Sequence, residues 1–256
     1  MFFDTHAHYD DEKFDGDRDE VLASLAEAGV SLVLDPGCTA ESSARAAELA
    51  ERWPFLWFAA GIHPEYCAAA GEKELSAVRE LLRHEKAVAV GEIGLDYHWE
   101  EYAPREAQHR MLRRQLEMAD ETGKPVIIHD REAHRDILSI LEEYPKVRGV
   151  FHCFSGSPEM ARELVKRGWY LGFDGPVTYK NAVQPLMASD QVPMDRLLLE
   201  TDSPYLAPVP HRGKRNSSRY LPFIAAVLAE RRGVTVEELA RTTAENGRRL
   251  FGIPAP

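Results

Sequence analysis

Short apolar segments alternate with longer amphipathic segments along the whole chain of 256 residues. Most of the short segments are unbroken apolar runs, such as Val126-Ile127-Ile128, which is typical of parallel strands covered on both faces. Eight segments have this character: Phe2–His6, Ser31–Asp35, Phe55–Ala60, Ala87–Gly91, Pro125–His129, Arg148–His152, Trp169–Phe173 and Arg196–Glu200. The pattern predicts an α/β protein with eight parallel strands.

The segments between these strands have the spacing of helices with one buried face. One example is the set Met111, Leu112, Gln115, Leu116 and Ala119. Gly123 is expected to end that helix, and Ser157 to cap the next but one, with a proline at its first position. Eight strand–helix units in about 250 residues indicate a TIM (β/α)8 barrel, which we predict as a single domain over residues 1–256. A doubly wound open sheet is the alternative, but its Gly-rich fingerprint is absent after the first strand.

Polar side chains that end the apolar runs are candidates for a functional site, because barrel enzymes place their working groups at the carboxyl ends of strands. His6 and His8 follow the first strand, at a spacing that directs both side chains to one face of an extended chain. Alone, this pair is equally consistent with two metal ligands and with a polar chain end. Other strands end in Glu92, His129, His152 and Asp202. Since several polar groups in an apolar interior must satisfy one another, we predict a metal centre.

The predicted ligands divide between two divalent ions, one held by His6, His8 and Asp202 and the other by His129 and His152. Glu92 would bridge both ions. Imidazole and carboxylate ligands suit Zn²⁺, Mn²⁺, Mg²⁺, Co²⁺ or Ni²⁺. Two such ions would activate a water for an in-line displacement at phosphorus, and Asp202 could take the proton of that water. Glu200, which shares the strand parity of Asp202, is expected to orient a histidine ligand.

A basic loop, His211-Arg212-Gly213-Lys214-Arg215-Asn216, follows the last strand. Charge runs are usually solvated surface, but the loops after strands 7 and 8 often bind phosphate in barrels. We therefore expect Arg212, Arg215 and Asn216 to contact substrate, together with Arg131 beyond the fifth strand. His63 could hydrogen-bond a phosphate oxygen or assist the leaving group.

Composition restricts the kinds of partner and the cellular compartment that we expect for the protein. The formal charge of -11 argues against a protein that grips nucleic acid over its whole surface, although a local cationic pocket is compatible with it. No apolar run approaches the ~20 residues that cross a membrane. We expect no secretory signal, because the first residues lack a basic stretch followed by an apolar one. The three cysteines are scattered without a C-x-x-C motif, which predicts reduced thiols in a cytoplasmic protein.

Six motifs together resemble the TatD family of metal-dependent deoxyribonucleases, and the resemblance covers essentially the whole chain. They are Asp4-Thr5-His6-Ala7-His8, Gly61-Ile62-His63-Pro64, Gly91-Glu92-Ile93-Gly94-Leu95-Asp96-Tyr97, His152-Cys153-Phe154-Ser155-Gly156, Glu200-Thr201-Asp202-Ser203-Pro204 and Arg212-Gly213-Lys214-Arg215-Asn216. The resemblance implies an amidohydrolase-like barrel that acts as a 3′-5′ exonuclease on DNA ends in single-stranded form, without an obligate protein partner. The ligand positions of the family match the six residues selected above, and His63, Arg131 and Asn216 match positions that resemble its phosphate contacts.

Other functions are compatible with the same ligands. A binuclear relative could hydrolyse a small-molecule ester, lactone, amide or phosphotriester, or another nucleic-acid ester such as an aminoacyl-tRNA. Many small-molecule relatives bridge their metals with a carbamylated lysine on the fourth strand, where this chain has Glu92, and Lys86 lies at the opposite end of that strand. A non-catalytic metal-binding or scaffold protein is the remaining alternative, which the complete ligand set disfavours.

Overall fold

The computed structural model describes residues 1–99 and 101–254 of the chain. Its sheet has eight strands that follow one another in chain order, and the predicted TIM (β/α)8 barrel fold is confirmed. The strands are β1 (Phe2–Asp4), β2 (Val30–Pro36), β3 (Leu56–Ala60), β4 (Ala87–Asp96), β5 (Val126–Arg131), β6 (Gly149–Phe151), β7 (Tyr170–Phe173) and β8 (Leu197–Leu199). The chain divides into two compact units, one formed by Met1–Asp35 with the chain from His152 onward, and the other by Pro36–Phe151.

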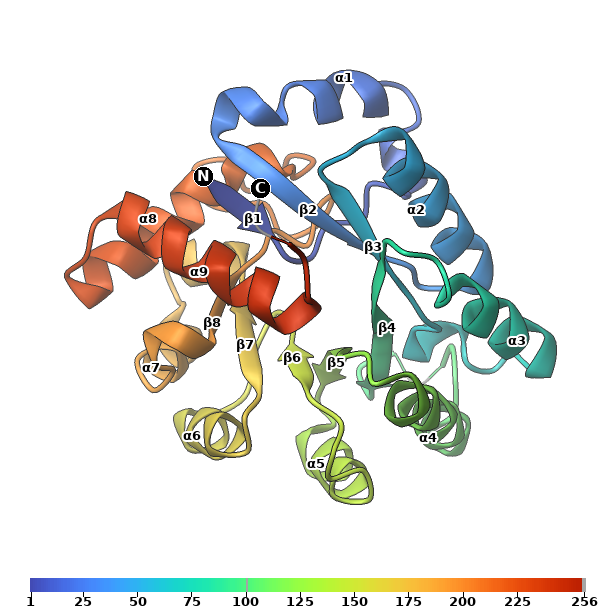
Figure 1. Ribbon diagram of the computed structural model, residues 1–256. Coiled ribbons are helices and arrows are strands. Elements are labelled where there is room, and N and C mark those ends of the chain that lie inside the picture. Colours follow the sequence, from blue (N-terminus) through green and yellow to red (C-terminus); the bar gives the residue numbers. More distant parts are fainter. Residues whose placement is uncertain (100, 255–256) are drawn as a thin grey trace. The chain divides into compact units, whose positions relative to one another are not determined.

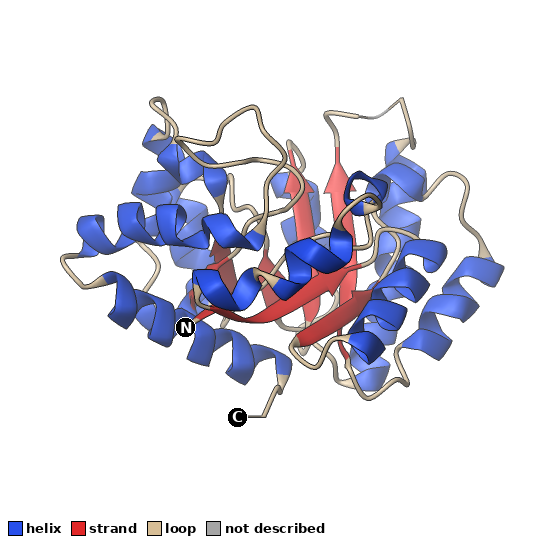
Figure 2. Ribbon diagram, turned by 90° about the horizontal axis from the view of Figure 1, so that it is seen from above, coloured by secondary structure: helices blue, strands red, loops and turns tan. Residues whose placement is uncertain are grey.

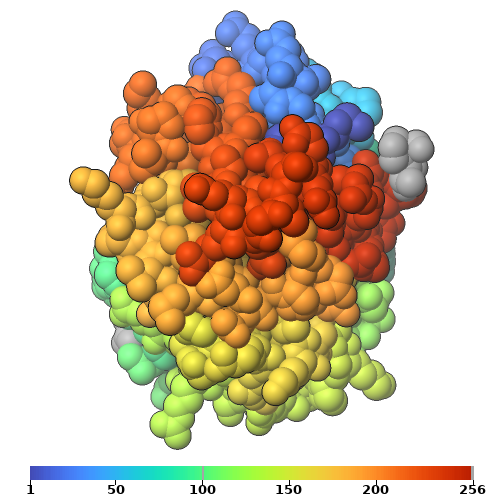
Figure 3. Space-filling view, turned by 90° about the vertical axis from the view of Figure 1, so that its left-hand side faces the viewer, coloured from blue at the N-terminus to red at the C-terminus, as the bar shows by residue number. Residues whose placement is uncertain are grey.

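The first unit contains β1, most of β2, β7 and β8, in which β1 pairs with β2 and β7 with β8, both in parallel. Its helices are α1 (Arg18–Ala23), α6 (Pro158–Lys166), α7 (Val183–Ser189), α8 (Leu221–Arg232) and α9 (Val236–Phe251). The last two helices adjoin on the surface of this unit, α8 in orange and α9 in red (Figure 3). Asn246 on α9 is buried and donates to the carbonyl oxygens of Met194 (2.6 Å) and Leu197 (2.9 Å), so α9 is fixed to the start of β8.

The second unit contains β3 to β6, which pair in parallel in that order. Its helices are α2 (Ala40–Arg52), α3 (Glu72–Leu81), α4 (Arg105–Thr122) and α5 (His134–Glu142). In Figure 1, α3, α4 and α5 lie on the outer side of these strands, and Figure 2 shows the helices in blue flanking the strands in red. Val126, Ile127 and Ile128 are fully buried, as expected for a strand covered on both faces.

The boundaries of β4 and β5 differ from the prediction. The sequence pattern ends the fourth strand at Gly91, whereas β4 continues to Asp96 and β5 continues beyond His129 to Arg131. The pairing shifts its register between Val90 and Ile93 and then resumes, because the apolar residues beyond Glu92 find partners on β5. Glu92 therefore lies at an irregularity within β4, and the strand ends in a second carboxylate.

The residues predicted to end one helix and to cap another have these roles in the structure. Gly123 ends α4 in a left-handed conformation (φ 67°), and the Ser157 side chain caps α6 by accepting from the Met160 amide. All three cysteines are free thiols.

Within the described ranges, no helix combines the length and the apolar character needed to span a bilayer.

Candidate metal centre

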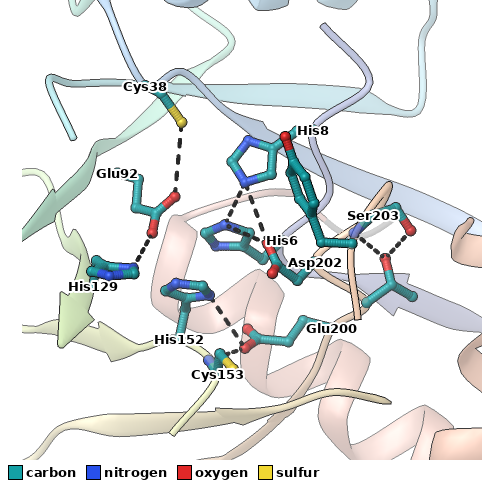
Figure 4. Close-up of polar contacts among 12 residues, drawn as sticks. His6, His8, Cys38, Glu92, His129, His152, Cys153, Glu200, Asp202 and Ser203 are labelled. Carbon is teal, nitrogen blue, oxygen red and sulfur yellow. Dashed lines mark hydrogen bonds and ion pairs between the residues drawn. The ribbon is translucent and has the colours of Figure 1, made fainter. Parts of the chain in front are cut away.

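His6 and His8 converge in the first unit, as the alternating pattern predicts. Beyond the end of β1 the chain stays extended, with Ala7 forming a parallel bridge to Ser203, so both rings face the same side. Their Nε2 atoms lie 3.1 Å apart. The Asp202 Oδ1 atom lies 3.4 Å from His8 Nε2 and 3.8 Å from His6 Nε2 (Figure 4). Three ligand atoms of the types predicted for one metal therefore meet at one point.

Two of the three separations fit a metal ion. With bonds of about 2.0–2.1 Å, two ligand atoms of one divalent ion lie roughly 3.0–3.4 Å apart. The His6–His8 and His8–Asp202 separations fall in this range, and the His6–Asp202 separation is longer. Burial raises the pKa of Asp202, but the hydrogen bond from His8 and the charges of His152 and His6 outweigh it, so that the pKa lies below its usual range. The carboxylate is therefore ionised at neutral pH, as a ligand must be.

His152 joins this group in the first unit. Its ring stacks on that of His6, with centroids 3.9 Å apart and planes 12° apart, and ligand atoms of both and of Asp202 lie within 4.8 Å of one another. The predicted orienting contact from Glu200 is long, at 3.8 Å between Glu200 Oε1 and His152 Nδ1. Glu200 instead accepts a hydrogen bond from the Cys153 amide, so it fixes the backbone directly after His152 (Figure 4).

A glycine on β7 makes room for Glu200. A Cβ atom added at Gly172 would lie 2.2 Å from Glu200 Oε2, so no other residue fits at this position while Glu200 keeps its place. Burial, and then the neighbouring charge of Asp174, raises the pKa of Glu200 well above its usual range. Burial thus favours the neutral form of the Glu200 carboxyl more than it would be favoured in an exposed glutamate.

The second unit brings together Glu92, His129 and His63. The Glu92 Oε1 atom lies 2.9 Å from His129 Nδ1 and 3.6 Å from His63 Nε2 (Figure 4 shows the first contact). His63 also caps the short 3-10 helix Pro64–Tyr66, because its Nδ1 accepts a hydrogen bond from the Glu65 amide. One ligand atom from each of the three lies within 4.8 Å of the others, which again suits a divalent ion.

Asp96, the last residue of β4, completes this group, although it was not among the predicted site residues. Its Oδ2 lies 2.9 Å from His129 Nε2, while its Oδ1 accepts from the backbone amides of His98 (2.9 Å) and Trp99 (3.2 Å). Burial lowers the pKa of His129, but the hydrogen bonds and charges of Asp96 and Glu92 prevail and raise it to about 10. A carboxylate behind a ligand histidine is the usual way to fix its ring orientation.

Two further buried acids lie at strand ends that the analysis of the sequence did not use. Asp35 follows the apolar run of β2, and His8, Asp10 and Asp35 offer ligand atoms within 4.8 Å of one another. Burial, and then the charge of Asp10, raises the pKa of Asp35 well above its usual range. Asp174 follows β7 directly, and burial likewise raises its pKa well above the usual range. The strand-end rule that selected Glu92 and Asp202 also selects these acids when it is applied to the second and seventh strands.

A buried hydrogen-bond network holds Asp202 in a left-handed conformation (φ 56°). The preceding residue, Thr201, donates to Asp4 through its amide (3.0 Å) and its hydroxyl (2.6 Å), and the Asp202 amide donates to the His6 carbonyl (2.9 Å). Asn216 is fully buried, and its side-chain amide donates to the Thr201 carbonyl (2.8 Å) and accepts from the Ser217 amide (2.8 Å). In this structure the polar atoms of Asn216 thus bind the backbone next to Asp202.

The predicted arginine contacts differ in their availability. Arg215 is engaged within the protein, because it forms a two-pronged ion pair with Asp17 and donates to the Lys13 carbonyl (2.6 Å). Arg212 is exposed and lies over the ring of Tyr179, with 4.3 Å between its Cζ and the ring centroid. Arg131 is exposed in the second unit at the end of β5. Arg212 and Arg131 therefore remain candidates for phosphate contacts.

Comparison with known proteins agrees with the motifs. A family model described as TatD related DNase matches residues 3–252. The chain belongs to this family. It is 44% identical to a Bacillus subtilis (strain 168) protein named "Uncharacterized metal-dependent hydrolase YabD", over 99% of this chain and 100% of that protein. It is 38% identical to a Cronobacter sakazakii protein named "3'-5' ssDNA/RNA exonuclease TatD", over 97% of each chain.

Among solved structures, the TatD homologue YJJV from Escherichia coli K12 is similar over 99% of this chain and 98% of that one. The TM-score is 0.92 and the sequence identity is 34%. Membership of the TatD-related DNase family, which the sequence motifs predict, is confirmed, and with it membership of a family of metal-dependent hydrolases.

Lys86 lies at the amino end of β4, as the sequence predicts. It precedes β4, and its Nζ donates to the carbonyl oxygens of Ala50 (2.6 Å) and Trp53 (3.0 Å) near the end of α2. The ammonium is thus fixed away from the carboxyl end of β4. A lysine at this place cannot occupy the position of Glu92 on the fourth strand.

Proposed function

We propose that this protein is a divalent-metal-dependent phosphodiesterase that removes nucleotides from the 3′ ends of single-stranded DNA. The observation that carries the proposal is the convergence of His6, His8 and the ionised Asp202 at ligand distances. The name of the Cronobacter sakazakii relative supplies the substrate class and the polarity of cleavage. The alternatives with a small ester or lactone as substrate stay as competing outcomes of the test below.

The residues of this chain divide into ligands and groups that handle substrate. We propose the ligands His6, His8, His152 and Asp202 in the first unit and Glu92 and His129 in the second; the assignment of Glu92 as a bridge stays a prediction. When bound, divalent ions supply Lewis acidity toward the phosphate and a lower pKa for the attacking water.

The remaining steps fall to side chains. The Asp202 carboxylate, held in place through Thr201, accepts the proton of the attacking water. The fixed ring of His63 donates a hydrogen bond to a phosphate oxygen or to the leaving group. The exposed guanidinium groups of Arg131 and Arg212 bind phosphates.

The test uses a single-stranded oligonucleotide labelled at its 5′ end, so that loss of nucleotides from the 3′ end gives a ladder. The protein is loaded in turn with Mg²⁺, Mn²⁺, Co²⁺, Ni²⁺ and Zn²⁺. Asp202→Asn keeps the shape of the side chain but removes its charge, and we expect a loss of at least about 100-fold in rate. Asp195→Asn, at an exposed position, is the matched control and should keep the wild-type rate. Intact DNA with every metal, beside hydrolysis of a lactone or a phosphotriester by the same sample, would overturn the proposal.

A further inference from the structure

The loop that follows Asp202 is held rigidly in the first unit. Five hydrogen bonds fix its backbone or the residues that it carries: Tyr205 N to Asp202 O (2.8 Å), Asn216 N to Pro204 O (3.0 Å), Tyr179 Oη to Ala207 O (3.1 Å), Val209 N to Thr178 Oγ1 (2.8 Å) and Tyr205 Oη to Asp11 Oδ2 (2.8 Å). The loop also packs closely on Gly175, where an added Cβ would lie 1.7 Å from the Leu206 carbonyl oxygen. The backbone of this loop is therefore fixed by the fold, and among its side chains Tyr205 is held by its hydroxyl.

This rigid loop presents apolar surface to solvent. Tyr205 is 43% exposed, Leu206 36% and Val209 46%. The ring of Tyr205 lies beside the metal-ligand candidate His8, with 6.4 Å between the ring centroids and 70° between the planes. The backbone amide of Tyr205 is bonded to Asp202 and its hydroxyl to Asp11, so the exposed ring is held next to the ligands.

Positive charge accompanies the exposed ring. The ammonium of Lys13, an exposed residue, lies 3.9 Å from the centroid of the Tyr205 ring. The stem of a lysine is flexible, so this ammonium can leave the ring for a nearby phosphate. Arg212 lies on the same unit, over Tyr179, whose hydroxyl holds the loop. A fixed aromatic face with a mobile cation beside it is complementary to a nucleobase with its phosphate.

We propose that Tyr205, with Lys13, forms the subsite that stacks against an unpaired nucleobase of the nucleic-acid substrate. The inference rests on the proposed function and deepens it. In a duplex each base is stacked and paired within the helix, whereas a base in a single strand or a frayed end can lie on a protein ring. The subsite would thus select single-stranded ends beside the ligands His8 and Asp202, and would tolerate any base because every base has an aromatic face.

The test compares a substrate that has bases at its 3′ end with one that has none there. Tyr205→Ala is assayed with a single-stranded oligonucleotide and with an oligonucleotide of the same length whose last four 3′ positions are tetrahydrofuran abasic residues, which keep the phosphodiesters but have no base. Loss of one stacked base should raise KM for the oligonucleotide with bases by about tenfold, within the range that stacking on aromatic side chains gives. The KM of Tyr205→Ala for the abasic oligonucleotide should stay within twofold of the wild-type value. Tyr205→Phe keeps the ring but loses the hydrogen bond to Asp11, so it should recover most of the affinity, with a KM within threefold of wild type.

Tyr102→Ala is the matched control, because Tyr102 is 55% exposed and lies in the second unit. An unchanged KM for the oligonucleotide in Tyr205→Ala, or an equal loss with both substrates, would overturn the inference. A second readout does not need turnover. Fluorescence of 2-aminopurine near the 3′ end of an oligonucleotide, mixed with protein in EDTA, should be quenched by wild type and much less by Tyr205→Ala. If wild type cleaves no DNA, the proposed function fails, and this quenching still decides the stacking inference.

Discussion

Asn216 separates two roles that the sequence alone cannot distinguish. The motif predicts contact with substrate. In the structure the side-chain amide of Asn216 is fully buried, donates to the Thr201 carbonyl and accepts from the Ser217 amide. In Asn216→Ala the Thr201 carbonyl and the Ser217 amide lose their partners, which should lower the free energy of unfolding by about 1–3 kcal/mol. The affinity for divalent metal should fall as well, because Thr201 holds Asp202. Urea unfolding and metal titration measure both quantities.

The control for this variant is Asn181→Ala, since Asn181 is exposed and its side chain is far less constrained. A contact with phosphate would instead give wild-type stability and metal affinity, with a raised KM for DNA alone. That outcome would return Asn216 to the substrate-binding set.

Single residues were predictable from the sequence where strand ends fixed them. His6 and His8 converge as an alternating pattern requires, and Asp202 reaches them because β8 ends just before it. The contacts of Arg215 and Asn216 within the protein were not predictable, because their partners Asp17 and Thr201 are identified only by the folded chain; substrate contact by these two residues stays a prediction. Asp96 was missed because the fourth strand was expected to end at Gly91, five residues too early.

The helix α9 packs closely on β1 at Gly247, a contact that cannot be inferred from the sequence of the helix. Gly247 lies on the buried face of α9, and a Cβ atom there would come within 2.7 Å of the Phe3 ring and 3.1 Å of Thr5 Cγ2. Helix propensity alone predicts that Gly247→Ala stabilises the protein by up to about 1 kcal/mol. Packing predicts the opposite sign, because the buried Phe3 ring has no room to move. We expect the free energy of unfolding to fall by about 1–3 kcal/mol, as is typical of overpacked cores.

Urea unfolding of Gly247→Ala beside Glu245→Ala, an exposed substitution on the same helix, measures this effect. The control should stay within about 0.5 kcal/mol of wild type. A stabilised Gly247→Ala protein would show that α9 can move away from β1.

Elements as a class were well predicted, since apolar periodicity marks each strand and helix, but distances of approach between elements need the structure.

For the molecule as a whole, eight repeats of strand and helix sufficed to predict the fold, because few architectures accommodate that order at this length. The sequence did not indicate the division of the chain into two compact units, one of which joins both ends of the chain. Candidate ligands lie in both units, His6, His8, His152 and Asp202 in the first and Glu92 and His129 in the second. Binding of metal should therefore raise the free energy of unfolding of both units. In the metal-free protein some of these ligands bind protons, so this effect should depend on pH.

His129 makes the direction of that titration predictable. The pKa of His129 is raised to about 10 by Asp96 and Glu92, against an ordinary value of 6.5, so the metal-free folded protein holds this proton more tightly than the unfolded chain. Its contribution to stability is complete below pH 6.5 and is lost as the pH rises toward 10. Asp4, whose pKa burial raises to about 6, titrates below this window. In EDTA, the free energy of unfolding should thus fall between pH 6.5 and 9.

Asp96→Asn removes one of the two acids that raise the pKa of His129, so the same measurement should show a shallower slope. Since a metal can bind only the deprotonated imidazole, loading should release protons in this window, and the apparent metal affinity should rise with pH. Calorimetric titration with Zn²⁺ or Mn²⁺ at pH 7.5, in two buffers of different ionisation enthalpy, counts those protons. Equal slopes for wild type and Asp96→Asn, together with binding that releases no proton, would show that His129 is neutral before metal arrives and would contradict the prediction.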